Sequence, residues 1–122
     1  MSERLLKRGD GWRLGWDPSA PCYPGLVGGD DWATELTAAE LADFCHLTRE
    51  VEQAMARIAT ELMAEERVAC TAASDRLWLE AEGLPAAYDL HLIVQGDRQV
   101  EGSWQAAAVP GLLQATQRLQ VF

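Results

Sequence analysis

The chain has 122 residues, of which 48% are hydrophobic and 24% are charged. This length and composition are typical of one globular domain spanning residues 1–122, and they exclude a disordered or low-complexity polymer. Nineteen acidic residues against ten basic ones give a net charge of −9, which disfavours a nucleic-acid partner held mainly through its phosphates.

The first predicted element is a strand at residues 11–18. Trp12, Leu14 and Trp16 alternate with Arg13 and two other residues, which is the period of a β-strand. We therefore expect the tryptophans and the leucine on a buried face, with Arg13 solvated or paired with a carboxylate.

A loop is predicted next, because residues 18–31 contain three prolines and three glycines. The run Gly25–Asp31 lacks the Gly-Lys-Ser/Thr ending of a phosphate loop, so we do not expect nucleotide binding. Its glycines instead suggest a turn with positive backbone φ that leads Trp32 into the core. Residues 32–36 alternate again and predict a second strand.

A long helix is predicted over about 37–66. Thr37 and Glu40 have the spacing of a capping box. An apolar stripe at helical spacing follows, from Leu41 to Leu62. About thirty residues would extend roughly 45 Å, more than one small sheet can cover. We therefore expect this helix to contact a second copy in a homodimer.

Four further strands and a second helix complete the predicted order ββ-α-ββββ-α, an α+β fold. The strands are read from short apolar runs separated by turn residues. They are expected at 68–73, 77–83, 88–95 and 99–104, with the helix at 106–120.

The termini and the cysteines indicate the compartment. The first residues lack the apolar segment of a signal peptide, and no apolar run is long enough to cross a bilayer. Cys22, Cys45 and Cys70 are widely spaced and odd in number, which fits neither a disulfide framework nor a zinc site. We expect a soluble cytoplasmic protein whose three cysteines are buried.

Five strings in the sequence resemble a family of small uncharacterised cyanobacterial proteins with plastid relatives. They are Gly11–Pro18, Tyr23–Thr37, Glu61–Glu66, Leu77–Gly83 and Glu101–Trp104. The resemblance implies a fold similar to that of Whirly-type regulators, which bind single-stranded DNA. Curved antiparallel sheets, helices that pair them and frequent dimers are the features it implies. It names no activity and no catalytic residues.

The N-terminal segment is the candidate contact surface for nucleic acid or a partner. Residues 1–16 carry a net charge of +2 against −11 for the rest of the chain. Basic side chains beside tryptophans are what a single-strand binder uses for phosphate contact and base stacking. The candidate residues are Arg4, Lys7, Arg8, Arg13 and Trp16. Lys7 is the only lysine, so the lysine-rich DNA-binding strand of Whirly-like proteins is missing.

No catalytic, cofactor or metal site is predicted. Glu80 and Glu82 share one face of a strand with Trp78, but carboxylates in this pattern are usually an exposed sheet face. His46 and His91 are too few for a zinc site and have no associated nucleophile.

The sequence therefore favours a non-enzymatic accessory factor that binds a protein or regulates one, without cofactor and away from membranes. Its acidic surface is expected to face a basic partner. The alternative is a divergent single-stranded nucleic-acid-binding protein that uses the N-terminal Arg/Trp segment.

Overall fold

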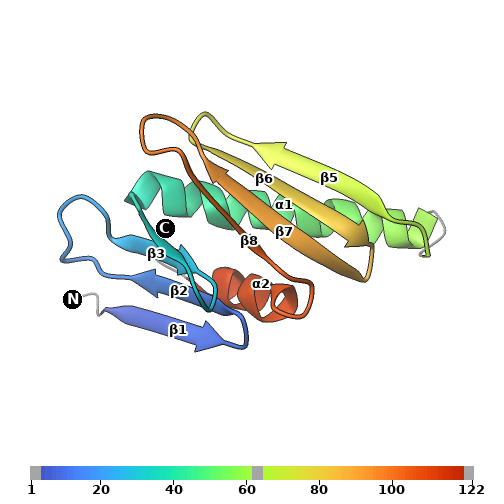
Figure 1. Cartoon of the computed structure of the whole chain (residues 1–122), viewed down its shortest axis with the longest axis horizontal. Coiled ribbons are helices and arrows are strands. Elements are labelled where there is room, and N and C mark those ends of the chain that lie inside the picture. The colour runs from blue at the N-terminus through green and yellow to red at the C-terminus, as the bar shows by residue number, and fades with distance from the viewer. Residues whose placement is uncertain (1–3, 62–64, 120–122) are drawn as a thin grey trace.

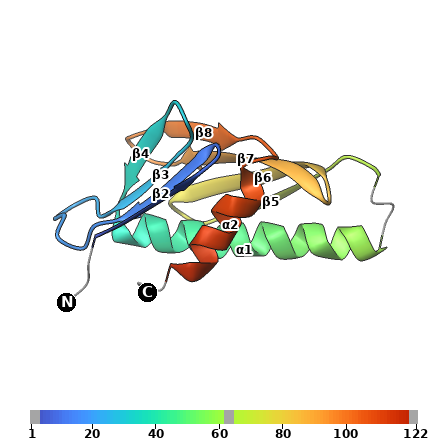
Figure 2. The ribbon, with the colours of Figure 1, turned by 90° about the horizontal axis from the view of Figure 1, so that it is seen from below.

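A computed structural model describes residues 4–61 and 65–119. Two four-stranded antiparallel sheets form one layer and two helices form the other, in the order ββββ-α-ββββ-α (Figure 1). Seen from below, both helices lie under the sheets, and α2 crosses α1 (Figure 2). The α+β class is confirmed, and each sheet is open rather than closed into a barrel.

The first sheet, sheet A, has the strand order β1-β2-β3-β4. Its strands are β1 (Leu5–Gly9), β2 (Trp12–Trp16), β3 (Gly25–Gly28) and β4 (Ala33–Leu36). Leu14 pairs with Val27, and both side chains are buried, so this face of the sheet covers the core.

The second sheet, sheet B, has the order β5-β6-β7-β8. Its strands are β5 (Val68–Ala73), β6 (Leu77–Leu84), β7 (Ala87–Val94) and β8 (Val100–Trp104). Along β6 and β7, buried residues alternate with more exposed ones, as the sequence predicts. Leu79 and Leu92 pair across these two strands in the core.

Helix α1 (Ala38–Glu61) starts with the predicted capping box. Thr37 N–H donates to Glu40 Oε1 at 2.8 Å, and Glu40 N–H donates to Thr37 Oγ1 at 3.1 Å. The helix is shorter than expected, because Glu65 and Glu66 already lie in a turn and a bend. Leu62, the last residue of the predicted stripe, is outside the described residues.

Most of the apolar stripe of α1 is covered within one chain, since the helix contacts strands of both sheets and α2, but Ile58 near its end is half-buried. Its buried apolar side chains are Leu41, Phe44, Cys45, Leu47, Val51 and Met55. The dimer prediction rested on a stripe that one sheet covers only in part, and the part from Leu41 to Met55 no longer supports it. The homodimer stays a prediction.

Helix α2 (Val109–Arg118) has Pro110 in its first turn, as expected, and packs against β2 and α1. Within the part of the chain that the structure describes, neither helix combines the length and apolar character that crossing a membrane requires.

The two predicted N-terminal strands are present as β2 and β4, but the predicted order missed β1 and β3. All five residues of β1 are exposed, so hydrophobic alternation cannot reveal it. β3 has the sequence Gly-Leu-Val-Gly and lies inside the predicted loop. Both strands pair with β2, so they depend on a neighbour rather than on their own pattern.

The prediction that all three cysteines are buried was also wrong. Cys45 is buried and Cys70 is half-buried, but Cys22 is exposed in the connection between β2 and β3. That connection is a loop on the protein surface, so the Cys22 side chain remains accessible to solvent.

Candidate functional site

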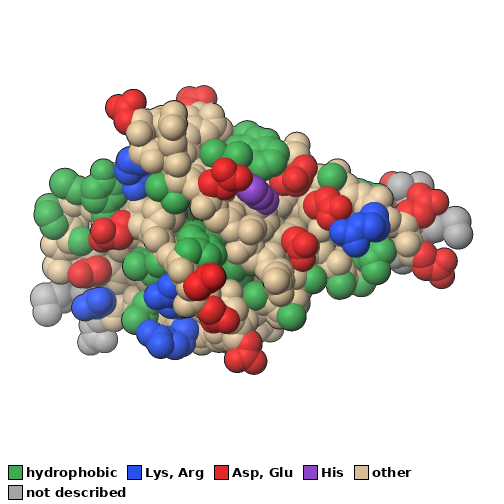
Figure 3. All heavy atoms as spheres, in the orientation of Figure 1, with side chains coloured by type: hydrophobic (Ala, Val, Ile, Leu, Met, Phe, Trp, Pro, Cys, Tyr) green, Lys and Arg blue, Asp and Glu red, His purple; other side chains and the backbone are tan. Residues whose placement is uncertain are grey.

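The predicted N-terminal contact residues do not form one surface. Arg4 precedes β1, and Lys7 and Arg8 are neighbours in β1 whose side chains point to opposite faces of sheet A. Arg13 and Trp16 belong to β2. Lys and Arg side chains (blue) nevertheless gather in the region of β1 and β2, at the lower left of the view, while Asp and Glu side chains (red) are spread more widely (Figure 3).

Arg13 is occupied by the protein itself. Its Nε donates to Gly29 O at 2.8 Å and its Nη2 donates to Trp32 O at 2.7 Å. The side chain is half-buried, so the expectation of a solvated or carboxylate-paired arginine was wrong. Trp32 O also accepts the Gly29 N–H at 2.9 Å, so Arg13 adds charged donors to the backbone hydrogen bond that closes this turn. Arg13 therefore fixes the turn between β3 and β4.

Trp16 is half-buried and packs against the core, together with Trp12. A ring in this position offers at most part of its face for base stacking. Of the five candidate residues, Arg4, Lys7 and Arg8 remain exposed.

Two tryptophans join the sheets, and we call this contact the tryptophan joint. Trp32, in the turn between β3 and β4, donates its indole N–H to Ser103 O of β8 at 3.2 Å. Trp104 of β8 donates its indole N–H to Gly28 O of β3 at 2.8 Å. The ring centroids are 5.0 Å apart. Each sheet thus supplies one donor and one acceptor to the other.

Glycines make room for this joint. A Cβ atom at Gly102 would lie less than 3.0 Å from three ring atoms of Trp32, and one at Gly29 would lie 2.7 Å from its Nε1. Positive φ occurs at Gly11, Gly83 and Gly96 among the glycines, but not at Gly28 or Gly29. The expectation of a positive-φ turn was therefore wrong. These glycines allow close approach of the indole ring.

An acidic hollow lies beside the tryptophan joint, with a volume of about 770 Å³. Four carboxylates line it: Asp10 from the β1–β2 turn, Asp30 and Asp31 from the β3–β4 turn, and Glu101 from β8. No Lys, Arg or His is among the described residues that line it. Four carboxylates around one concave surface raise its negative potential.

The charges around the hollow are unevenly paired. Asp10, Asp30 and Asp31 form no ion pair with any side chain in the described ranges. Glu101 Oε1 lies 2.5 Å from His91 Nε2, a close contact without hydrogen-bond geometry. Three of the four carboxylates that line the hollow therefore have no counter-charge among the described residues.

The outer face of sheet B does not assemble a catalytic pair. Glu82 is held by Arg67 in a 2.6 Å ion pair, and Glu80 lies opposite His91 in the ladder. Among the residues that the structure describes, no three His, Cys, Asp or Glu side chains are grouped as metal ligands. Burial raises the pKa of the Cys45 thiol to about 11, so this thiol stays protonated near neutrality.

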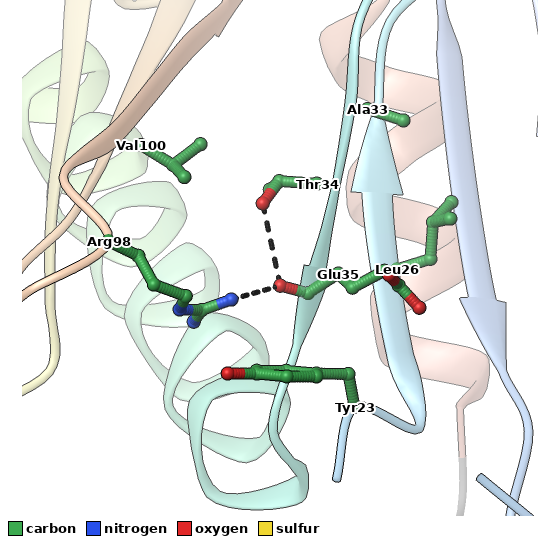
Figure 4. A pocket seen from close by; sticks show the side chains of 7 residues that line it. All are labelled: Tyr23, Leu26, Ala33, Thr34, Glu35, Arg98 and Val100. Atoms are coloured by element: carbon green, nitrogen blue, oxygen red, sulfur yellow. Dashed lines mark hydrogen bonds between the residues drawn. The ribbon is translucent and has the colours of Figure 1, made fainter.

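A second pocket of about 650 Å³ lies between β3, β4 and the β7–β8 turn (Figure 4). Arg98 donates to Glu35 O at 2.6 Å, forms an ion pair with Glu40, and lies 4.8 Å from the Tyr23 ring centroid. Its guanidinium is thus occupied by protein groups. This pocket shows a second link between the sheets rather than a prepared ligand site.

Sequence reasoning missed the acidic hollow, because its carboxylates are separated by up to 91 residues and meet only through the fold. One signal was present. The string Gly-Gly-Asp-Asp-Trp places two carboxylates beside a tryptophan.

Comparison with known proteins agrees with this fold. A family model described as "Domain of unknown function (DUF1818)" matches residues 7–119. A crystal structure of a protein of unknown function from Prochlorococcus sp. NATL2A, described as a DUF155 family member, has a TM-score of 0.88. It is 23% identical, and the match covers 94% of this chain and 97% of that one. The comparison with curated proteins gives no significant match.

Proposed function

We propose that this chain, which belongs to the DUF1818 family of unknown function, binds a basic segment of a partner protein in the acidic hollow and acts without enzymatic chemistry. The observation that carries the proposal is the charge arrangement. Four carboxylates from three separate segments line one hollow, and no described cation lines it. A partner that brings cations would complete it.

The chemistry of the hollow favours arginine over lysine. Trp32 is half-buried beside Asp30 and Asp31, so part of its ring is available to a guanidinium. A planar guanidinium can stack on an indole and also bind a carboxylate through two parallel hydrogen bonds. The ammonium group of lysine provides only a point charge.

The expected affinity is moderate and depends on salt. Each exposed charge pair contributes about 0.2–1 kcal/mol, and an exposed cation–π contact adds roughly 0.5–1 kcal/mol. Surface charge of this kind raises the rate of association more than it slows dissociation. A regulatory contact that forms and breaks readily fits these magnitudes.

The lining of the hollow gives no support to a catalytic role. Ser103 is the only hydroxyl residue among the described lining residues. His91 lies opposite it in the β7–β8 ladder, but its Nε2 contacts Glu101 Oε1 at 2.5 Å, and no hydrogen bond joins it to Ser103 within the described residues. Nucleophilic catalysis needs a nucleophile and a base within hydrogen-bond reach.

Binding of a labelled arginine-rich nonapeptide tests the proposal by fluorescence anisotropy. We expect the double variant Asp30→Asn/Asp31→Asn to weaken binding at least tenfold. The matched control is Glu65→Gln/Glu66→Gln, which removes the same charge from two exposed residues in the turn before β5.

The control variant should bind like the parent chain. Equal weakening by both variants would show that only net charge attracts the peptide and would overturn the proposal. A lysine nonapeptide that binds as tightly as the arginine one would remove the role assigned to Trp32.

A further inference from the structure

Strand β1, at one edge of sheet A, has a free side that can pair with a further strand. Within the described residues β1 pairs with β2 alone, so its second edge presents unpaired backbone groups. All five of its residues are exposed. Leu5 is 37% exposed and Leu6 is 50% exposed, and Tyr23 is the only other large hydrophobic residue exposed in the described chain.

The side chains of β1 form a simple pattern on the outer face of the sheet. Leu6 lies opposite Gly15 and Arg8 lies opposite Arg13, on the face away from the buried Leu14. Arg4 and Leu6 also line one small hollow of about 110 Å³ over Gly15. On the outer face at this edge, Leu6 therefore lies between two cationic side chains, Arg4 and Arg8.

The corresponding edge of sheet B lacks this pattern. Its outer strand, β5, has the sequence Val-Ala-Cys-Thr-Ala-Ala, and its side chains alternate between half-buried and exposed. None of its large hydrophobic side chains is exposed. Exposed leucines between cations therefore occur on β1 but not on β5.

A second copy of the chain does not suit this edge. Two antiparallel β1 strands related by a two-fold axis must pair in a register centred on one residue. Centring on Leu6 places Arg4 against Arg8 of a second copy twice, and centring on Lys7 or on Arg8 places that cation against itself. Centring on Leu5 avoids like charges, but among the described residues it pairs only 4–6. Like charges directly opposite each other destabilise a strand pair.

We propose that the free edge of β1 accepts an acidic strand from a partner protein, which extends sheet A by a fifth strand. On the outer face that strand carries a carboxylate, an apolar residue and a second carboxylate at alternate positions. The carboxylates pair with Arg4 and Arg8, and the apolar side chain packs beside Leu6. Main-chain hydrogen bonds give such strand addition its affinity, and alternate side chains give it specificity. This surface is separate from the acidic hollow, so the two proposals stand or fall independently.

A labelled peptide with Glu-Thr-Val-Thr-Glu at its centre tests this proposal by anisotropy and amide hydrogen exchange. We expect saturable binding and slower exchange in residues 5–9, with residues 68–73 unchanged. Leu6→Ser and Arg8→Glu should each weaken binding at least tenfold. Arg57→Glu on the exposed face of α1 changes the net charge equally and should have no effect.

Several results would overturn the proposal. Equally tight binding of the charge-reversed peptide, with Lys-Thr-Val-Thr-Lys at its centre, would contradict it. Equal weakening by Arg57→Glu and Arg8→Glu would also contradict it. Absence of saturable binding would have the same force. Protection of residues 5–9 without peptide, together with a doubled mass, would assign the edge to a second copy. A mixed-sequence oligonucleotide that protects this strand more than the peptide would assign it to nucleic acid.

Discussion

The two sheets have the same number of strands, but different forces hold them together. In sheet B, β6 and β7 are eight residues each and bury every second side chain. In sheet A, the strands have four or five residues, and β1 buries none of its side chains. Sheet B is thus stabilised mainly by its own apolar face, whereas sheet A relies on contacts that other segments supply.

Those contacts concentrate at the turn between β3 and β4. Arg13 binds two carbonyl oxygens of this turn, and the tryptophan joint fastens it to β8. The same turn supplies Asp30 and Asp31 to the acidic hollow. The comparison therefore links the stability of sheet A directly to the proposed binding site.

The largest expected effect comes from Trp104→Ala, which removes a ring that is 2% exposed and contacts Phe44 and Trp32. We expect a loss of about 3–5 kcal/mol in the free energy of unfolding, measured by urea denaturation. Trp78→Ala, on the half-buried outer face of β6, should cost clearly less. Equal losses would show that Trp104 has no special role between the sheets.

Alkaline pH tests the burial of Cys45, which lies on α1. Burial raises the pKa of Cys45 from 9.0 to about 11, so the folded chain holds this proton more tightly than the unfolded chain. The contribution of this thiol to the free energy of unfolding is therefore fully present below pH 9, and up to about 3 kcal/mol is lost between pH 9 and 11. Urea melts across this range should show a weaker pH dependence in Cys45→Ala. An unchanged dependence would assign the loss to other groups.

Arg13→Lys separates the charge of this side chain from its geometry. A lysine keeps the charge but cannot reach two carbonyls with two fixed N–H groups. Hydrogen bonds from charged donors contribute about 1.5–3 kcal/mol each, so we expect a loss of that order for the one lost bond. Thermal denaturation measures it. A variant with parental stability would show that the turn is held without Arg13.

Two glycine-to-alanine substitutions compare one strand of each sheet. Gly102→Ala forces the Trp32 ring away from β8 and should cost about 1–3 kcal/mol, the usual cost of overpacking. At Gly15 in sheet A, an added Cβ meets its nearest neighbour, Leu6 Cδ1, at an ordinary 3.4 Å. Gly15→Ala should therefore be close to neutral. The order of the two stabilities in urea is the test, and a reversed order would refute the joint as described.

The smallest expected effect concerns nucleic acid. Three exposed cations, Arg4, Lys7 and Arg8, allow a log–log salt slope of only about −2, at roughly −0.7 for each phosphate contact. We expect a mixed-sequence 30-mer to bind no more tightly than about 10 µM at physiological salt, within the usual non-specific range. Submicromolar anisotropy data that depend on Trp16 would promote the nucleic-acid alternative.

Local signals in the sequence predicted much of the fold. The capping box at Thr37 and the alternation of β6 and β7 depend on neighbours in the chain, and both were found as expected. β1 and β3 were not predictable in the same way. They pair with β2 through backbone groups, which leave no trace in side-chain periodicity.

The candidate site was less predictable for the same reason. Composition indicated a negative surface, but the carboxylates of the acidic hollow come from distant turns that the tryptophan joint brings together. Arg13 was singled out by its charge, although its two bonds to the β3–β4 turn make it structural. Side-chain orientation decided both cases, and the pattern of residues does not contain it.

The most direct test of the account is a map of amide and indole NMR shifts during titration with the arginine nonapeptide. We predict that the largest changes fall on the Trp32 indole and on residues 10, 30–32 and 101–105, with little change in β5. Changes that are spread evenly over the acidic surface, or that leave the Trp32 indole unmoved, would contradict the acidic hollow as the binding site.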